Sequence, residues 1–396
     1  MVSQQKLRMG NNRSCIRELF EFGRQRAAVV GRENVYDFSL GNPSVPAPDE
    51  VNAAIRKLID ELEPMQVHGY TTAAGLDEVR RVIAQDLNDR FGTAFSAKNL
   101  FITSGAAPAL CSVCSALTID ASSEFIAIAP FFPEYTLFTT TAGARFTSIP
   151  ADIAQFQINF DLLEAAISRD TQGVVINSPN NPSGVVYTEQ TIQRLAALLE
   201  RKSEEYGKPI YLISDEPYRE LIYDGIPYPF VTKYYKNAIV CYSYSKCLSL
   251  PGERIGYVLV PDETQDSADV MFAVAGAARA MGHVCAPSLM QHMLTRCASV
   301  RPDLEPYVKN RDLLYSELSR MGYRCAKPSG AFYLFMQAPN GDGDAFSEAA
   351  KAYDLLIVPG RDFGCPGYVR MCYAVSEQTI RGALPAFEKL WAQFGK

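Results

Sequence analysis

The sequence lacks the patterns that mark several large classes of protein. No apolar run among its 396 residues approaches the ~20 that a membrane-spanning helix requires. Residues 1–6 have no apolar core of the kind found in secretory signal peptides. Repeats, low-complexity segments and runs of like charge do not occur. We therefore expect an ordinary globular protein without a membrane partner.

Basic charge and histidine are also scarce. Lysine and arginine number 38 against 44 aspartates and glutamates, which gives a net charge of −6. A nucleic-acid partner would require a basic surface, so none is expected. With only three histidines, the single pair Cys111 and Cys114 is better explained as helix core than as a metal or redox site. The ten cysteines show no disulfide framework, which favours a reducing, cytoplasmic location.

The residues that are present suit a large folded protein. Apolar residues make up 47% and charged residues 21%, close to the average for globular proteins. Buried strands alternate with helices between residues 99 and 260, which predicts a mostly parallel sheet. A helix is expected near 266–281, and one long helical stretch near 286–320.

The most informative stretch is 243–256. The apolar residues 238–242 indicate a buried strand that leads into Ser243-Tyr244-Ser245-Lys246, and Arg254 follows eight residues after the lysine. Hydroxyls and an arginine suit a phosphate dianion, and a lysine held near a second cation becomes a nucleophilic amine. Because an amine forms a Schiff base with an aldehyde, the combination favours pyridoxal phosphate, which carries both groups.

This stretch resembles the cofactor-lysine signature of class I/II aminotransferases, the fold-type I pyridoxal-phosphate enzymes. The spacing of the two serines, the lysine, the arginine and the final glycine is specific, and further matching motifs extend over nearly the whole chain. The resemblance implies that Lys246 holds the cofactor and moves the proton at the substrate Cα as general base and acid. It also implies that Ser243, Ser245 and Arg254 bind the cofactor phosphate.

A second anion site is predicted around residue 105. The strand 99–103 runs into Ser104-Gly105-Ala106-Ala107, and a helix is expected from Pro108. Unpaired backbone N–H groups and the helix dipole face such a turn, and a glycine lets an anion approach closely. Under the resemblance, Gly105 and Ala106 bind the cofactor phosphate.

A buried carboxylate is expected to meet the cofactor ring. Asp215 follows the apolar strand 210–214, and a carboxylate at the end of a buried strand is costly unless it is paired. A protonated pyridine nitrogen would pair it, and the ring could then accept electrons. The resemblance implies this role for Asp215 and implies that Tyr218 and Asn181 donate to the ring oxygen.

Two aromatic residues gain roles only from the resemblance. Phe132 would stack on the pyridine face, and a plain core ring is the alternative. Tyr70, in the polar loop 68–75, would cross the interface of a homodimer and touch the partner's cofactor phosphate. The site would then be shared between two subunits.

The substrate site is implied in the same way. Arg370 lies inside the apolar segment 367–372, where a guanidinium needs an anion, and the resemblance assigns it the substrate α-carboxylate. A structural salt bridge is the alternative. Asn181 would share this site, and Gly41 would lie in a turn over the substrate, although an ordinary turn explains Gly41 equally well.

The resemblance also implies the fold and the reaction. It implies an aspartate-aminotransferase-like α/β domain, residues 61–294, with helices on both faces of the sheet, and a smaller α+β domain from 1–60 and 295–396. The expected activity is transfer of an amino group between an L-amino acid and a 2-oxo acid. An aspartate-specific aminotransferase and a carbon–sulfur or β-elimination lyase are alternatives on the same scaffold. A non-catalytic ligand-binding relative is disfavoured because Lys246 is retained.

The substrate side chain is less well defined by the sequence. Some aspartate-using members of this family place a lysine just after the phosphate-loop glycine, and this chain has Ala107 at that position. Arg279, Arg13 or Arg17 could hold a second carboxylate instead. We expect a neutral or broad amino-acid substrate, with aspartate as the second possibility.

Overall fold

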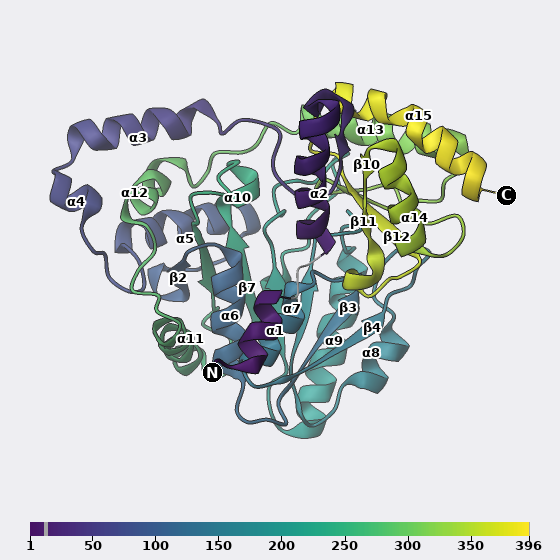
Figure 1. Ribbon diagram of the computed structural model, residues 1–396. Coiled ribbons are helices and arrows are strands. Elements are labelled where there is room, and N and C mark those ends of the chain that lie inside the picture. Colours follow the sequence, from purple (N-terminus) through teal and green to yellow (C-terminus); the bar gives the residue numbers. More distant parts are fainter. Residues whose placement is uncertain (12–14, 396) are drawn as a thin grey trace. The chain divides into compact units, whose positions relative to one another are not determined.

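The computed structural model describes residues 1–11 and 15–395 and divides the chain into two compact units. Unit 1 comprises Met1–Ser44, Asn181–Val185 and Leu304–Lys396, and unit 2 comprises Val45–Asn180 and Val186–Asp303. Both ends of the chain, purple and yellow in Figure 1, thus belong to unit 1. Residues 45–60 lie in unit 2, whereas the expected small domain included them.

Unit 2 is built on a seven-stranded sheet with the strand order β2-β8-β7-β6-β5-β3-β4. The pairs from β7 through β4 are parallel, and β8 runs antiparallel to both of its neighbours. The strands are β2 (Leu100–Thr103), β3 (Glu124–Ala129), β4 (Arg145–Pro150), β5 (Thr171–Asn177), β6 (Tyr211–Asp215), β7 (Ala238–Ser243) and β8 (Gly256–Leu259).

The central strands are apolar because they are covered on both sides. Every residue of β5, β6 and β7 is buried, as expected for parallel strands that lie between layers of helices. The edge strand β4 is different: only Ile149 among its six residues is buried. The apolar runs in the sequence therefore marked the inner strands of the sheet.

The helices of unit 2 lie on both faces of this sheet. Connections from β2 to β3 and from β3 to β4 run in one direction along the sheet, and those from β4 to β5 and β6 run back. Since such crossovers are right-handed, α6 and α7 cover one face and α8 and α9 the other. In agreement, α6 packs on β7, β8 and α7. The helices are α3 (Asp49–Glu61), α4 (Pro64–His68), α5 (Asp77–Phe91), η2 (Ala97–Asn99), α6 (Ala106–Leu117), α7 (Glu134–Thr141), α8 (Phe160–Ala166), α9 (Glu189–Tyr206), η3 (Val231–Lys233), α10 (Tyr244–Cys247), α11 (Ser267–Ala280) and α12 (Ser288–Cys297). The predicted mostly parallel α/β sheet is confirmed.

Unit 1 combines helices with two small sheets. The antiparallel sheet has the order β11-β12-β9, and β1 pairs with β10 in parallel. Leu19 of α2 packs with Leu356, Val358 and Phe363 in a buried cluster, which joins the N-terminal helix to the C-terminal part of the chain. The elements are α1 (Gln4–Asn11), α2 (Cys15–Val30), η1 (Arg32–Asn34), β1 (Tyr36–Asp37), α13 (Glu305–Met321), β9 (Tyr333–Gln337), α14 (Gly343–Ala350), η4 (Lys351–Tyr353), β10 (Leu355–Leu356), β11 (Val358–Pro359), η5 (Gly360–Phe363), β12 (Tyr368–Cys372) and α15 (Glu377–Phe394).

One expected helix is two helices. The stretch near 286–320 was predicted to be continuous, but α12 ends at Cys297 and α13 begins at Glu305. Pro302 lies between them, and proline disfavours helical backbone at the residue before it and cannot donate to a preceding turn. The helix expected from Pro108 begins at Ala106 instead, because a proline is tolerated in a first turn.

Two kinds of feature were sought over residues 1–11 and 15–395. Within these ranges, no helix is long and apolar enough to cross a membrane. Nor do three or more histidine, cysteine, aspartate or glutamate side chains gather there in a way that could hold a metal ion.

Candidate active site

Polar side chains of unit 2 gather where the parallel strands end. Asp215 is the last residue of β6, and Asn177, the last residue of β5, is its register partner. The Asn177 amide donates to the Asp215 backbone oxygen at 2.8 Å. Tyr135, from the first turn of α7 after β3, donates its hydroxyl proton to Asp215 Oδ2 at 2.5 Å. Open α/β sheets bind ligands at this edge.

The ionisation of Asp215 is strongly perturbed. Burial raises the pKa of its carboxyl group to about 7, the Tyr135 hydrogen bond acts in the opposite direction, and the charge of Glu216 adds to the rise. One carboxylate oxygen, Oδ1, is buried without a hydrogen-bond partner. An unpaired buried carboxylate oxygen is unfavourable, so this atom marks a place where a ligand donor fits.

The phosphate-binding residues predicted from the sequence lie together in unit 2. The hydroxyl oxygens of Ser243 and Ser245 are 2.7 Å apart, and Arg254 Nη1 donates to Ser245 Oγ at 3.3 Å. A Cβ on Gly105 would lie 2.5 Å from Arg254 Nη2, so the arginine can approach the turn only because residue 105 is glycine. Gly105 has a φ of 97° and precedes Ala106, where α6 begins. Hydroxyls, a guanidinium and a helix N-terminus form a donor set that suits a phosphate dianion.

The backbone around the predicted phosphate-binding residues is constrained. Arg254 has a φ of 55°, in the left-handed region that non-glycine residues seldom adopt. Lys246 lies on the short helix α10, which begins directly after β7 and whose N-cap residue is Ser243. The Tyr244 N–H donates to Ile255 O at 3.1 Å, which joins the lysine segment to the arginine segment.

Two other predicted ring-binding residues occupy suitable elements of unit 2. Tyr218 is buried in the turn that follows Asp215. Phe132 is half-buried, and its ring meets the Tyr135 ring edge-on, with centroids 5.7 Å apart. The aromatic and carboxylate residues expected at the cofactor ring therefore belong to one neighbourhood.

Arg370 forms a second polar group, within unit 1. It is 1% exposed, donates from Nη1 to Asn181 Oδ1 at 3.2 Å, and also donates from Nη2 to the Ser39 backbone oxygen. Its guanidinium lies over the Tyr333 ring at 4.7 Å from the centroid. The Nε atom is buried without a partner. The observed acceptors of Arg370 are the neutral oxygens of Asn181 and Ser39. The structural salt bridge that was the alternative for Arg370 is therefore not found among the described residues.

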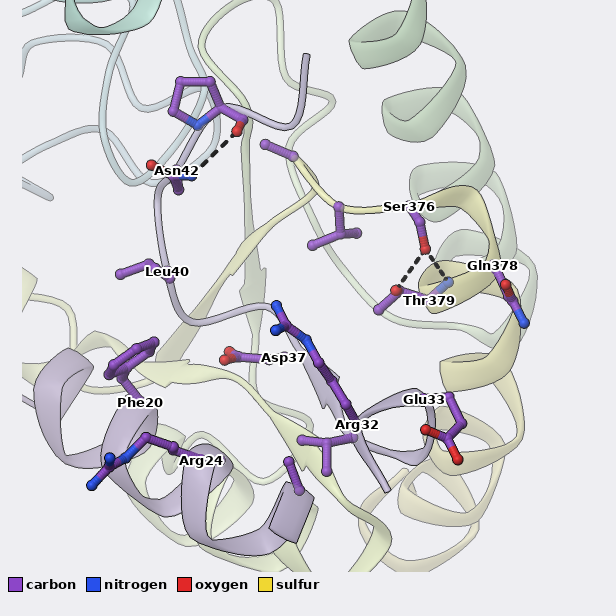
Figure 2. A pocket seen from close by; sticks show the side chains of 16 residues that line it. Phe20, Arg24, Arg32, Glu33, Asp37, Leu40, Asn42, Ser376, Gln378 and Thr379 are labelled. Atoms are coloured by element: carbon purple, nitrogen blue, oxygen red, sulfur yellow. Dashed lines mark hydrogen bonds between the residues drawn. The ribbon is translucent and has the colours of Figure 1, made fainter. Parts of the chain in front are cut away.

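Gly41 belongs to the same neighbourhood of unit 1. A Cβ at this position would collide with the Tyr333 hydroxyl, so only glycine fits. Beside this turn, a cavity of about 890 Å³ extends between α2 and the start of α15. Figure 2 shows Phe20 and Arg24 on one side of it and Ser376, Gln378 and Thr379 on the other. None of the sequence-predicted site residues lines this cavity.

The loop that carries Tyr70 is held firmly while the tyrosine itself is exposed. Gln291 of α12 is buried and donates to Thr71 Oγ1 at 3.0 Å, and its side-chain oxygen accepts from the Leu76 N–H at 2.7 Å. Tyr70 is 89% exposed. The loop therefore presents this tyrosine away from its own unit.

Two of the three arginines proposed to hold a second substrate carboxylate belong to the described residues. Arg279 is exposed at the C-terminal end of α11, and Arg17 is exposed on α2. Arg13 lies outside the described residues. Ala107 is in the first turn of α6.

Sequence reasoning missed Tyr135 and Asn177. Asn177 could have been found by the argument used for Asp215, because it is a polar residue at the end of an apolar strand. Tyr135 carried a weaker signal: a hydroxyl-bearing ring in the first helical turn after a strand. Its distance from Asp215 in the sequence hides the contact, since the two chain segments come together only through the sheet order, in which β5 alone separates β3 from β6.

Comparisons with known proteins agree in the kind of protein that this chain resembles. The family model "Aminotransferase class I and II" matches residues 33–387. A probable aspartate/prephenate aminotransferase of Thermus aquaticus is 30% identical, with 91% of this chain and 93% of the relative covered. A probable N-acetyl-LL-diaminopimelate aminotransferase of Bacillus subtilis is also 30% identical, with 91% and 90% covered. The crystal structure of an aminotransferase from Eubacterium rectale is 56% identical, covers 100% of both chains and has a TM-score of 0.98.

Proposed function

The chain belongs to the class I and II aminotransferases and is a pyridoxal-phosphate-dependent enzyme, and we propose which of its residues move the amino group. The observation that carries the assignment is the buried Asp215 carboxylate, whose Oδ1 atom has no partner and lies at the strand edge that also presents Lys246. The protein transfers an amino group between an amino acid and a 2-oxo acid.

The residues of unit 2 fit the cofactor. The unpartnered Asp215 oxygen suits the protonated ring nitrogen, Tyr135 holds the carboxylate, and Asn177 holds the Asp215 backbone oxygen. Ser243, Ser245, Arg254, Gly105 and Ala106 suit the phosphate. We assign Phe132 to the ring face, and Tyr218 and Asn181 to the ring oxygen. When bound, the cofactor supplies the aldehyde that takes up the amino group and a ring that delocalises negative charge.

Lys246 has the acid–base role. Its amine accepts the proton from the substrate Cα and then donates a proton to complete the transfer. Asp215, when ionised, would stabilise the positive charge of a protonated ring nitrogen. That positive charge would lower the cost of negative charge near the reacting carbon. Arg370, whose Nε atom has no partner, binds the substrate α-carboxylate. Asn181 and Gly41 complete this carboxylate site.

The substrate is expected to be neutral or varied in its side chain. The lysine that some aspartate-using members carry is replaced by Ala107. Aspartate is the alternative, since one of the matched relatives is named as a probable aspartate/prephenate aminotransferase. A pocket built to pair a second carboxylate would reject neutral side chains, because its cation would be left unpaired.

A panel of amino acids tests this proposal. Kinetics with aspartate, alanine and phenylalanine, each with a 2-oxo acid acceptor, should give comparable kcat/KM values and stoichiometric new amino acid. A large aspartate preference that collapses in Arg279→Ala would contradict the proposed breadth and assign Arg279 to the second carboxylate. Release of pyruvate and ammonia from a β-substituted amino acid, without amino transfer, would indicate a lyase instead.

We propose that the working unit is a homodimer in the cytoplasm. The exposed Tyr70, on a loop fixed by Gln291, suits contact with a partner's cofactor phosphate. None of the ten cysteines, all of which are described residues, forms a disulfide, and six of them are buried, which suits a reducing compartment.

A further inference from the structure

A buried arginine that the proposed reaction does not use lies beneath the cofactor residues of unit 2. Arg219 follows Asp215 in the turn after β6, and its side chain is 2% exposed. Its three nitrogen atoms each meet a different acceptor. Nη1 pairs with Glu216 at 2.9 Å, Nη2 donates to the Tyr257 hydroxyl at 2.8 Å, and Nε pairs with Glu220 at 3.2 Å.

The contacts continue from Arg219 to the lysine segment. Glu220 Oε2 accepts the Tyr242 hydroxyl proton at 2.6 Å, and that hydroxyl lies 3.0 Å from Cys247 Sγ. The Arg219 guanidinium also covers the Tyr242 ring, 4.1 Å from its centroid. Tyr242 in turn stacks on Tyr257, with centroids 4.9 Å apart. One side chain thus contacts β7, β8 and the turn after β6.

This chain of contacts reaches residues that lie close in the sequence to those assigned to the cofactor. Glu216 is bonded directly to Asp215, and Cys247 directly to Lys246. Tyr257 lies three residues after Arg254 and opposite Tyr242 in the sheet. Asp215 ends β6, Lys246 follows β7 and Arg254 precedes β8, and Arg219 contacts a neighbouring residue on β7, on β8 and after β6.

Stability alone does not explain such a group. Removing a guanidinium and two carboxylates from water is expensive, and a buried ion pair is often no more stabilising than apolar residues of similar volume. Three acceptors in fixed directions do, however, match the planar fork of an arginine and not the single ammonium of a lysine. The arrangement therefore favours a role in geometry.

We propose that Arg219 is a positioning residue that sets the relative placement of Asp215, Lys246 and Arg254 for pyridoxal phosphate. The inference rests on the proposed function of these three residues. Its action is indirect: Arg219 orients the strand ends through Glu216, Tyr257 and Glu220, and it touches neither the substrate nor the cofactor.

Charge supports the same assignment. The neighbouring Glu216 raises the pKa of Asp215, and Arg219 places a positive charge against Glu216. Ser214 and Tyr228 also donate hydrogen bonds to Glu216. Arg90 pairs with Glu220 at 2.9 Å and also lies 3.5 Å from Asp86, whose other oxygen pairs with Arg301. Removing Arg219 would leave Glu216 without its ion-pair partner beside Asp215.

The test uses Arg219→Lys, which keeps the charge but cannot reach three acceptors together. Apo-protein is titrated with pyridoxal phosphate, and the absorbance of the bound cofactor is then followed against pH. We expect about tenfold weaker binding of pyridoxal phosphate, which is the size of effect typical when a group that orients ligand-binding side chains is lost. We also expect a shift in the pH midpoint of the absorbance change. The control is Arg311→Lys, which changes another arginine that is 1% exposed, in unit 1. Both variants should lose thermal stability, but only Arg219→Lys should change the two cofactor readouts.

A milder variant covers the case in which Arg219→Lys does not fold. Tyr257→Phe removes only the hydroxyl that accepts from Arg219, and Tyr235→Phe, which removes a hydroxyl bonded to Ile210 O at 2.6 Å, is its control. Weaker binding and a shifted midpoint in Tyr257→Phe alone would support the assignment. Unchanged affinity and midpoint in a folded Arg219→Lys or Tyr257→Phe would overturn it. Failure of the unaltered protein to bind pyridoxal phosphate would overturn the proposed function as well.

Discussion

The ionisation of Asp215 depends on neighbours that act in opposite directions. Burial has the largest effect and raises the pKa of its carboxyl group, the hydrogen bond from Tyr135 lowers it and the charge of Glu216 raises it, and together they bring the pKa to about 7. A carboxylate that pairs with a protonated ring nitrogen has to be ionised near neutral pH. Because Tyr135 donates a hydrogen bond to the charged form of Asp215, it keeps the carboxylate ionised to lower pH than burial alone would allow.

We predict that Tyr135→Phe weakens cofactor binding in a pH-dependent way. Without the hydroxyl donor, the pKa of Asp215 rises further, so the carboxylate forms only at higher pH. Titration of apo-protein with pyridoxal phosphate between pH 6 and 9 should show a loss of about tenfold at neutral pH. The loss should shrink as the pH rises.

The control for this prediction is Tyr235→Phe, which removes a buried hydroxyl that bonds to a backbone oxygen. It should leave the pH profile of cofactor binding unchanged. An equal, pH-independent loss in both variants would mean that Tyr135 only packs against its neighbours.

At the residue scale, the sequence revealed groups with unusual chemistry but not their partners. A lysine between serines and an aspartate at the end of an apolar strand are informative by themselves. Tyr135 and Arg219 are ordinary in sequence, and their importance comes from contacts with residues 80 and 38 positions away. Such contacts depend on which strands become neighbours.

The strand ends are the elements that bring the cofactor residues together. Parallel strands present their carboxyl ends at one edge of the sheet, which is why residues after β2, β5, β6 and β7 can meet. The turn after β2 shows how tight this edge is. Gly105 has a φ of 97°, and Arg254 fills the space where a side chain would begin.

We predict that Gly105→Ala lowers the affinity for pyridoxal phosphate by at least about tenfold. The new Cβ would displace Arg254, and the positive φ adds backbone strain of about 1 kcal/mol or more. Isothermal titration of apo-protein measures the effect. Gly207→Ala is the matched control, because Gly207 also has a positive φ, 67°, but no atom lies within 4 Å of its Cβ position. Equal affinity in the two variants would contradict the role of the turn.

At the element scale, the buried strands were predictable and the interruptions were less so. Apolar runs located β2, β6 and β7 closely because every residue of these strands is buried. The break between α12 and α13 was missed although Pro302 signals it, because the helical periodicity resumes on the far side. Unit boundaries also depend on long-range packing, as the return of Asn181–Val185 to unit 1 shows.

At the scale of the whole molecule, the exposed Tyr70 makes a dimer testable. A tyrosine that is 89% exposed in its own chain has no local reason to affect cofactor affinity. We predict a dimer in sedimentation at assay concentration and weaker cofactor binding in Tyr70→Phe, by several-fold for one hydrogen bond to a charged group.

Mixed dimers provide the control. A Tyr70→Phe subunit combined with a Lys246→Ala subunit would contain one site that has both an intact lysine and an intact tyrosine from the partner. High-affinity binding and activity should return in that site. An active monomer, or no recovery in the mixed species, would refute the shared site.

The most direct measurement of the central claim is covalent trapping of the cofactor. Borohydride reduction of the protein loaded with pyridoxal phosphate, followed by peptide mapping, should place the adduct on Lys246 and nowhere else. The same treatment of Lys246→Ala should give no adduct, although the phosphate-binding residues remain. An adduct on another lysine of the unaltered protein, or full amino transfer by Lys246→Ala, would contradict the account.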